Sequence, residues 1–316
     1  EADAEKNDKK LRSTFHHVLF LCSVLGVTLF IFTVLSKQIM YFMHQPKEVV
    51  DLASPYIDWV AFSLIPVIVY QGYKQFADGL SKTKYSMYAI FMANVVHIFF
   101  NYVLIYGIWI FPKLGILGAA LGTVISRIMM VVFMHFLLNN DELLKKYLHK
   151  FSFKEVRKSM LKKIIDLGFP SAMQMLFEVA LFTTAIWLSG SLGKNSQAAN
   201  QIALILSSST FMVAMGLSVA SMIRVGYAKG LNKYKDLIII ARSLFLLTII
   251  IESVFALLFL VFHNFLPHLF LNMTDVTEIV DNNEIIWIAS RLLLVAAVFQ
   301  IFDGVQVVVL GALRGL

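Results

Sequence analysis

The sequence predicts an all-α protein that crosses a membrane about eight times, and its composition and the order of its apolar and polar segments lead to this prediction. Hydrophobic residues make up 59% of the 316 residues and charged residues 15%, with a mean hydropathy of +0.75. Soluble domains contain about 25% charged residues. The apolar residues form long runs, and the polar residues collect in the breaks between them. Helices are the expected spanning elements, because backbone groups in lipid must be satisfied within the protein.

Eight apolar runs have the roughly 20 residues that a helix needs to cross a hydrocarbon core of ~30 Å. The breaks between them contain glycine, proline, asparagine or charged residues, which are typical of turns and loops. Pro66 and Pro170 lie inside runs and are expected to bend them. The predicted spans are 15–36, 56–79, 86–110, 115–138, 165–189, 198–223, 237–262 and 285–311.

Basic residues are distributed unequally between alternate loops. With a cytoplasmic N-terminus, nineteen Lys and Arg residues fall on the inside and four on the outside. This asymmetry is typical of cytoplasmic loops. It accounts for the net charge of +7 without a nucleic-acid partner, and it leaves membrane lipid as the partner of the basic residues at the surface. Together with the absence of a cleavable signal pattern, it predicts a multi-pass protein of a bacterial cytoplasmic (inner) membrane.

The longest polar stretch, 139–163, separates two halves that resemble each other. Residues 59–83 and 287–316 each begin with Trp and small residues, and each then places an aromatic residue directly before a Gln. Repeated halves are a common way to build a transporter with a central site. The predicted organisation is an N-terminal helical bundle at 1–138, a basic cytoplasmic linker at 139–163 and a C-terminal bundle at 164–316.

A channel or a membrane enzyme is the other interpretation of a chain with many spans. A channel usually has a filter-like loop or a ring of charges, and an enzyme has a constellation of His, Asp and Glu. The sequence has neither, and the lone Cys22 excludes a disulfide framework and a cysteine-based zinc site. We therefore expect a transporter rather than an enzyme, without a cofactor.

Two carboxylates lie deep inside predicted spans, where an ionisable group is costly and is a functional candidate. Glu178 and Asp303 have no Lys or Arg within a helical turn, whereas Gln174 and Gln306 lie at helical spacing from them. Carboxylate and amide oxygens bind Na⁺, and a desolvated carboxylate can hold a proton. Glu178 and Asp303 are the predicted cation-coupling residues and the candidate Na⁺ ligands. The alternative for each is a purely structural hydrogen bond to a neighbouring helix.

Other polar residues inside the spans are weaker candidates. Glu252 is a third acid inside a span, and it is expected to pair with another helix, with a functional role as the alternative. Lys74 and Asp78 lie four residues apart and predict a local ion pair. His97 and Asn101 share one helix face. We expect them either to join two helices by hydrogen bonds or to line a cavity.

Four stretches resemble the MATE family of cation-coupled multidrug exporters, and in particular its NorM-like bacterial branch. They follow the order of the family and together run through nearly the whole chain. They are NYVLIYGIWIFPKLGILGAALGTVISR (101–127), LGFPSAMQMLFEVALF (167–182), QAANQIALILSSSTFMVAMGLSVASMIRVGYAKG (197–230) and FQIFDGVQVVVLGALRG (299–315).

The resemblance implies a fold of twelve helices in two bundles, of which this chain carries about eight, the third through the tenth. It also implies a monomer that exports organic cations in exchange for Na⁺ or H⁺. Glu178 and Asp303 fall on acidic positions that are implicated in cation coupling in NorM-like members. The other residues expected to line the cavity are Gln174, Asn200, Gln201, Phe299, Gln306, His97 and Asn101.

A flippase for lipid-linked oligosaccharides, from the same superfamily, is the alternative function. Its pyrophosphate-bearing substrate would need a basic cavity. The two acids favour a cationic cargo instead.

Overall fold

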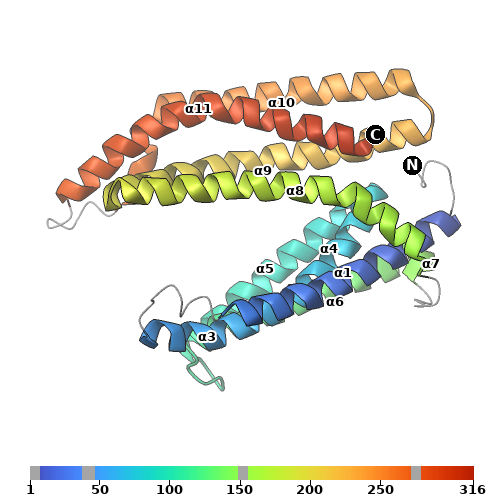
Figure 1. The fold of residues 1–316 in the computed structure, drawn as a ribbon, viewed down its shortest axis with the longest axis horizontal. Coiled ribbons are helices and arrows are strands. Elements are labelled where there is room, and N and C mark those ends of the chain that lie inside the picture. The colour runs from blue at the N-terminus through green and yellow to red at the C-terminus, as the bar shows by residue number, and fades with distance from the viewer. Residues whose placement is uncertain (1–7, 38–46, 149–155, 272–278) are drawn as a thin grey trace. The chain divides into compact units, whose positions relative to one another are not determined.

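The computed structural model describes residues 8–37, 47–148, 156–271 and 279–316, which form helices joined by short connections (Figure 1). No strand occurs among these residues, so the predicted all-α class is confirmed. Eight segments in the same ranges are long and apolar enough to span a membrane, as predicted. The elements are α1 (Asp8–Ser36), α3 (Lys47–Phe62), α4 (Leu64–Gly79), α5 (Thr83–Tyr106), α6 (Ile116–Asn140), α7 (Glu142–Leu148), α8 (Lys158–Ser191), α9 (Lys194–Gly230), α10 (Tyr234–Phe262), η2 (Leu266–Leu269) and α11 (Ile279–Gly315).

Several helices extend beyond the apolar runs from which they were predicted. The helix α8 begins at Lys158, inside the predicted linker, and it continues without a break through Pro170. The linker also contains α7, and its residues 149–155 lie outside the described part of the chain. The length of an apolar run underestimates the length of its helix, because Lys and Arg are good helix formers and continue a helix outside the lipid.

The chain divides into two compact units, Lys6–Asp166 and Leu167–Leu316. In the N-terminal unit, α5 packs along α6, while α4 contacts both α1 and α6. The segments α3 and α4 make one span that is broken at the buried Ser63. Pro66 explains the break, because it lacks the N–H group that would bond the carbonyl of Phe62. The core of this unit contains Tyr70, Ala77, Ala89, Ala93, Met130, Met134, Leu138, Leu144 and Tyr147.

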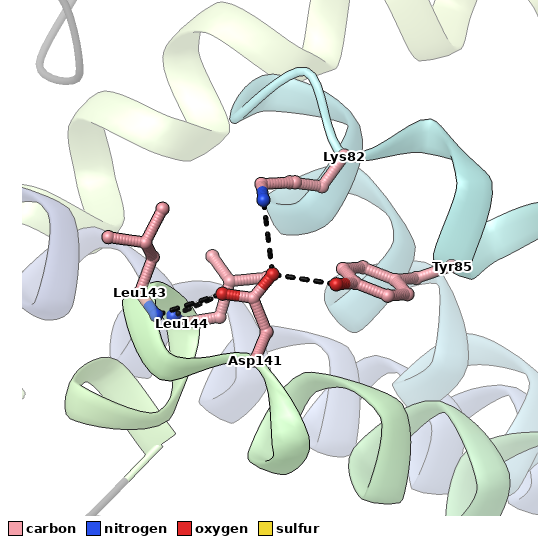
Figure 2. A network of polar contacts seen from close by, with 5 residues as sticks. All are labelled: Lys82, Tyr85, Asp141, Leu143 and Leu144. Atoms are coloured by element: carbon pink, nitrogen blue, oxygen red, sulfur yellow. Dashed lines mark hydrogen bonds and ion pairs between the residues drawn. The ribbon is translucent and has the colours of Figure 1, made fainter.

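A polar network holds α7 against the connection between α4 and α5 (Figure 2). Asp141 lies between α6 and α7, and its Oδ1 accepts the backbone N–H groups of Leu143 at 2.9 Å and Leu144 at 3.2 Å. These bonds cap the first turn of α7. Its Oδ2 accepts hydrogen bonds from Lys82 Nζ at 3.1 Å and Tyr85 Oη at 2.7 Å. One carboxylate therefore caps α7 and fixes it to a distant part of the chain.

Replacing Asp141 with Ala is expected to lower the free energy of unfolding by about 1–2 kcal/mol, because both the cap and the ion pair are lost. Asp141→Asn keeps an oxygen for the cap and is expected to cost less. The thermal unfolding midpoints of the purified proteins test this. An Asn variant as unstable as the Ala variant would contradict the contribution of the cap.

The Asp141 network also predicts a dependence of stability on pH. Burial by itself raises the pKa of the Asp141 carboxyl, but hydrogen bonds from Tyr85, Lys82 and two backbone N–H groups outweigh burial and hold the pKa below its usual value. Such a group stabilises the fold at pH values above about 3.9, which is the pKa of an Asp carboxyl in an unfolded chain. This stabilisation is lost as the pH falls toward the lower pKa that the carboxyl has in the folded protein. The stability difference between wild type and Asp141→Asn is therefore expected to shrink below about pH 4. Unfolding midpoints measured against pH test this, and a constant difference would contradict it.

In the C-terminal unit, α9 and α11 pack against each other along much of their length, and α10 contacts both (Figure 1). Small residues bring α9 and α11 together, as is common for helices in membranes. Ser218 Oγ donates to the carbonyl oxygen of Val307 at 2.7 Å, and Gly311 lies directly against Ser218. By contrast, no residue of α8 is buried. The packed part of the unit is thus built by α9, α10 and α11.

Candidate functional site

A cavity of about 660 Å³ lies among α8, α9 and α11 in the C-terminal unit. Its wall is mainly apolar and contains two acids and a short run of serines. A concave, mostly apolar site with few polar groups is the usual form of a small-molecule site. The lining residues are Met175, Glu178, Val179, Phe182, Thr183, Ile186, Gln201, Leu204, Ile205, Ser207, Ser208, Ser209, Phe211, Met212, Phe299 and Asp303.

Both predicted cation-coupling residues line this cavity. Glu178 is carried by α8 and Asp303 by α11, so residues 125 positions apart in the chain reach one space. Among the described residues, neither carboxylate has a hydrogen bond or an ion pair, and both are only partly exposed. Two acids with like charge in an apolar cavity repel each other, and a bound cation relieves that repulsion. The arrangement therefore favours a cation.

Aromatic and sulfur-containing side chains surround the acids. The rings of Phe182 and Phe299 meet edge to face, with centroids 6.3 Å apart and an interplanar angle of 79°. Met175 and Met212 add flexible side chains that can adapt to different shapes. A ring face attracts a cation and also packs against an apolar body. The cavity suits a compound that has both a positive charge and a large apolar part.

The other residues predicted for the site are not all at this cavity. Gln201 and Phe299 line it together with the two acids. Gln174 instead lies 3.5 Å from Arg314 Nη2. Gln306 is exposed on α11 and does not line the cavity, and Asn200 does not line it either. Gln306 and Asn200 thus carry amides on helices that line the cavity, but neither residue is part of the lining.

Several lining residues were missed by the sequence analysis. Phe182 follows Glu178 by four residues and so lies on the same helix face, which was a usable signal. The consecutive serines Ser207, Ser208 and Ser209 interrupt an apolar span, and this polar run was a second signal. The contribution of Met212 had no local signal, because methionine fills both membrane-facing and packing positions.

His97 lies at a separate cavity of about 390 Å³ in the N-terminal unit. Its Nε2 is 3.2 Å from both the amide nitrogen of Asn101 and the hydroxyl oxygen of Thr123, so it joins α5 to α6. Asn101 does not line the cavity. Arg127 does, and it donates to Ser63 Oγ at 2.6 Å. This cavity contains a guanidinium and, among its described lining residues, no acid.

Comparison with known proteins agrees with the fold and with the resemblance in the sequence. The chain is 30% identical to the probable multidrug resistance protein NorM of Agrobacterium fabrum, over 89% of this chain and 60% of that protein. It is 34% identical to the multidrug resistance protein MdtK of Photorhabdus laumondii, over 78% of this chain and 52% of that protein. The chain thus spans less than two thirds of the length of these curated relatives.

The fold matches the crystal structure of the eukaryotic MATE transporter AtDTX14 with a TM-score of 0.84, at 19% identity, over 99% of this chain and 67% of that one. The MatE family model matches residues 4–103 and 170–316. Most of the chain lies within these two matched segments, and the all-helical fold agrees with them. The chain therefore belongs to the MatE family.

Proposed function

We propose that the protein exports cationic amphipathic compounds across the inner membrane of a bacterium in exchange for Na⁺ or H⁺. The observation that carries this proposal is the pair of carboxylates, Glu178 and Asp303, in one largely apolar cavity. The relatives are named as multidrug resistance proteins, which supports the same class of substrate. The excess of Lys and Arg in alternate loops supports a cytoplasmic position for the connections at 80–82 and 231–233.

In this proposal, the coupling ion and the organic cation compete for the negative charge of the cavity. Loading with Na⁺ or H⁺ neutralises Glu178 and Asp303 and so weakens the binding of the organic cation. Competition alone moves nothing across a membrane. Transport requires the two ligands to have different affinities for inward-facing and outward-facing states of the protein.

The N-terminal cavity favours a second candidate, the flippase for lipid-linked oligosaccharides. Arg127 supplies a planar set of N–H donors, which suits the oxygens of a phosphate. His97 lies in the same wall and can add a second donor. In this alternative the cargo is an anion rather than a cation.

Two ions of the same shape and opposite charge separate the candidates. Tetraphenylphosphonium and tetraphenylborate differ in the sign of their charge but have similar apolar bodies. Binding of each to the purified protein is measured by isothermal titration calorimetry, at several Na⁺ concentrations and pH values. We expect tetraphenylphosphonium to bind, and we expect Na⁺ or a lower pH to weaken its binding. Preferential binding of tetraphenylborate would reject cation export and favour the flippase.

A further inference from the structure

Glu252 is a third acid inside the C-terminal unit, and it lies outside the cavity. It is carried by α10 and is 1% exposed. Neither of its carboxyl oxygens has a hydrogen-bond partner among the described residues. The pairing with another helix that the sequence analysis expected is therefore not found within the described residues. A buried polar group without a partner is rare and calls for a specific explanation.

The carboxyl group of Glu252 lies against α11 at Gly304. A Cβ atom added to Gly304 would be 2.7 Å from Glu252 Cγ and 3.0 Å from Cδ, so any larger residue there would force this side chain to move. The preceding residue, Asp303, lines the cavity, while Gly304 itself is buried. Consecutive residues of α11 therefore line the cavity and contact Glu252.

Few charged groups surround Glu252. On α11, the titratable residue nearest to the contact at Gly304 is Asp303, which directly precedes it. The helix α9, which also contacts α10, has no titratable residue between Lys194 and Arg224. On α10 itself the next charged residue is Arg242, ten residues and thus roughly 15 Å away along the helix. Among the described helices packed around it, no cation faces the Glu252 carboxyl.

These surroundings make the charged form of Glu252 unfavourable when the cavity is empty. An ionised carboxylate that is buried without a hydrogen bond or a counter-ion is expensive, and such a group takes up a proton instead. A negative charge on Asp303 favours the protonated form of Glu252 further, because a nearby like charge disfavours ionisation. A cation bound at Asp303 offsets that charge, and the ionised form of Glu252 then becomes less unfavourable.

We propose that Glu252 is a proton-binding site coupled to the cavity, which holds its proton while Asp303 is unoccupied and releases it when an organic cation binds there. In the release step the O–H bond of the Glu252 carboxyl breaks, its electron pair stays on the carboxylate, and the proton passes to water. The coupling is reciprocal, so a proton on Glu252 weakens the binding of the cation. This inference rests on the proposed function only for the presence of a cation at Asp303.

The proton itself is detected by infrared spectroscopy. A protonated carboxyl gives a carbonyl stretching band that an ionised carboxylate does not give. We expect the purified wild-type protein at neutral pH to show such a band, and we expect Glu252→Gln to lose the part of it that Glu252 contributes. Gln is a neutral side chain with nearly the same shape as the protonated acid, so it should preserve the packing at Gly304. Glu252→Ala serves the same purpose if the Gln variant does not fold.

The coupling is detected by counting protons. Tetraphenylphosphonium is added to protein in weakly buffered solution, and the released protons are measured with a pH-sensitive dye. We expect wild type to release more protons for each bound cation than Glu252→Gln does, and we expect the Glu252 infrared band to weaken on binding. The control is Glu284→Gln, which changes an exposed acid of α11. It should keep both the band and the proton release of wild type.

The outcomes separate this inference from the proposed function. A carbonyl band of the same intensity in wild type and Glu252→Gln overturns the proton site, even if the protein binds and exports cations. Equal proton release from wild type and Glu252→Gln overturns the coupling. If tetraphenylphosphonium does not bind wild type, cation export and the coupling both fail, while the band still decides whether Glu252 holds a proton.

Discussion

Efflux of a cationic dye is expected to fall by more than about tenfold when Glu178 is replaced by Gln or Asp303 by Asn. A hydrogen bond or contact to a charged group contributes about 1.5–3 kcal/mol, and 1.4 kcal/mol corresponds to a factor of ten in affinity. Each substitution keeps the size of the side chain and removes only its charge. The double variant is expected to have no measurable efflux, because the cavity then has no acid among its described lining residues.

The measurement is ethidium efflux from cells that express each variant at the same level, with a Na⁺ or an H⁺ gradient. Asp236→Asn and Glu284→Gln are matched controls, since both change exposed acids outside the cavity. These controls should transport like wild type. Unchanged efflux in Glu178→Gln and Asp303→Asn would reduce the two acids to structural residues. The gradient that stimulates wild type identifies the coupling ion.

Gly311→Ala is expected to lower the free energy of unfolding of the protein by about 3 kcal/mol, because an added methyl group cannot fit between α9 and α11. The new Cβ atom would collide with the backbone carbonyl oxygen of Ser218. A flexible side chain could move aside, but here the neighbour is backbone. The helices must therefore separate, and the hydrogen bond from Ser218 Oγ to Val307 is strained as well.

Gly216→Ala is the matched control for this prediction. Gly216 lies on α9, and an added Cβ atom there meets no heavy atom within 4 Å. Because Ala is a better helix former than Gly, this variant is expected to be as stable as wild type or more stable, by about 0.5–1 kcal/mol. The thermal midpoints of the purified proteins decide the matter. Equal midpoints for the two variants would show that the contact between α9 and α11 is looser than described.

The acids of the cavity could be identified from the sequence because the cost of a charge in lipid depends on the residue and its position in a span. Glu178 and Asp303 stand out for this reason alone, before any helix is placed. The all-α class and the number of spans follow from the length of the apolar runs in the same way. Such properties are local, and the sequence displays them directly.

The remaining features depend on contacts between distant parts of the chain. Asp141 meets Tyr85 across 56 positions of sequence, and nothing near Asp141 indicates that partner. Gln306 and Asn200 were predicted to line the cavity, yet the rotation of its helix places each outside the lining. Glu252 was expected to have a polar partner, and its environment became clear only when Gly304 was seen beside it.

The uneven packing of the C-terminal unit has a consequence for how the protein can evolve. The helix α8 supplies six lining residues of the cavity but contains no buried residue, whereas α9 and α11 line the cavity and also hold each other. A substitution at Met175 or Val179 can thus reshape the cavity without loosening the packing between α9 and α11. Changes in the shape of the cavity along α8 therefore leave the contact between α9 and α11 intact.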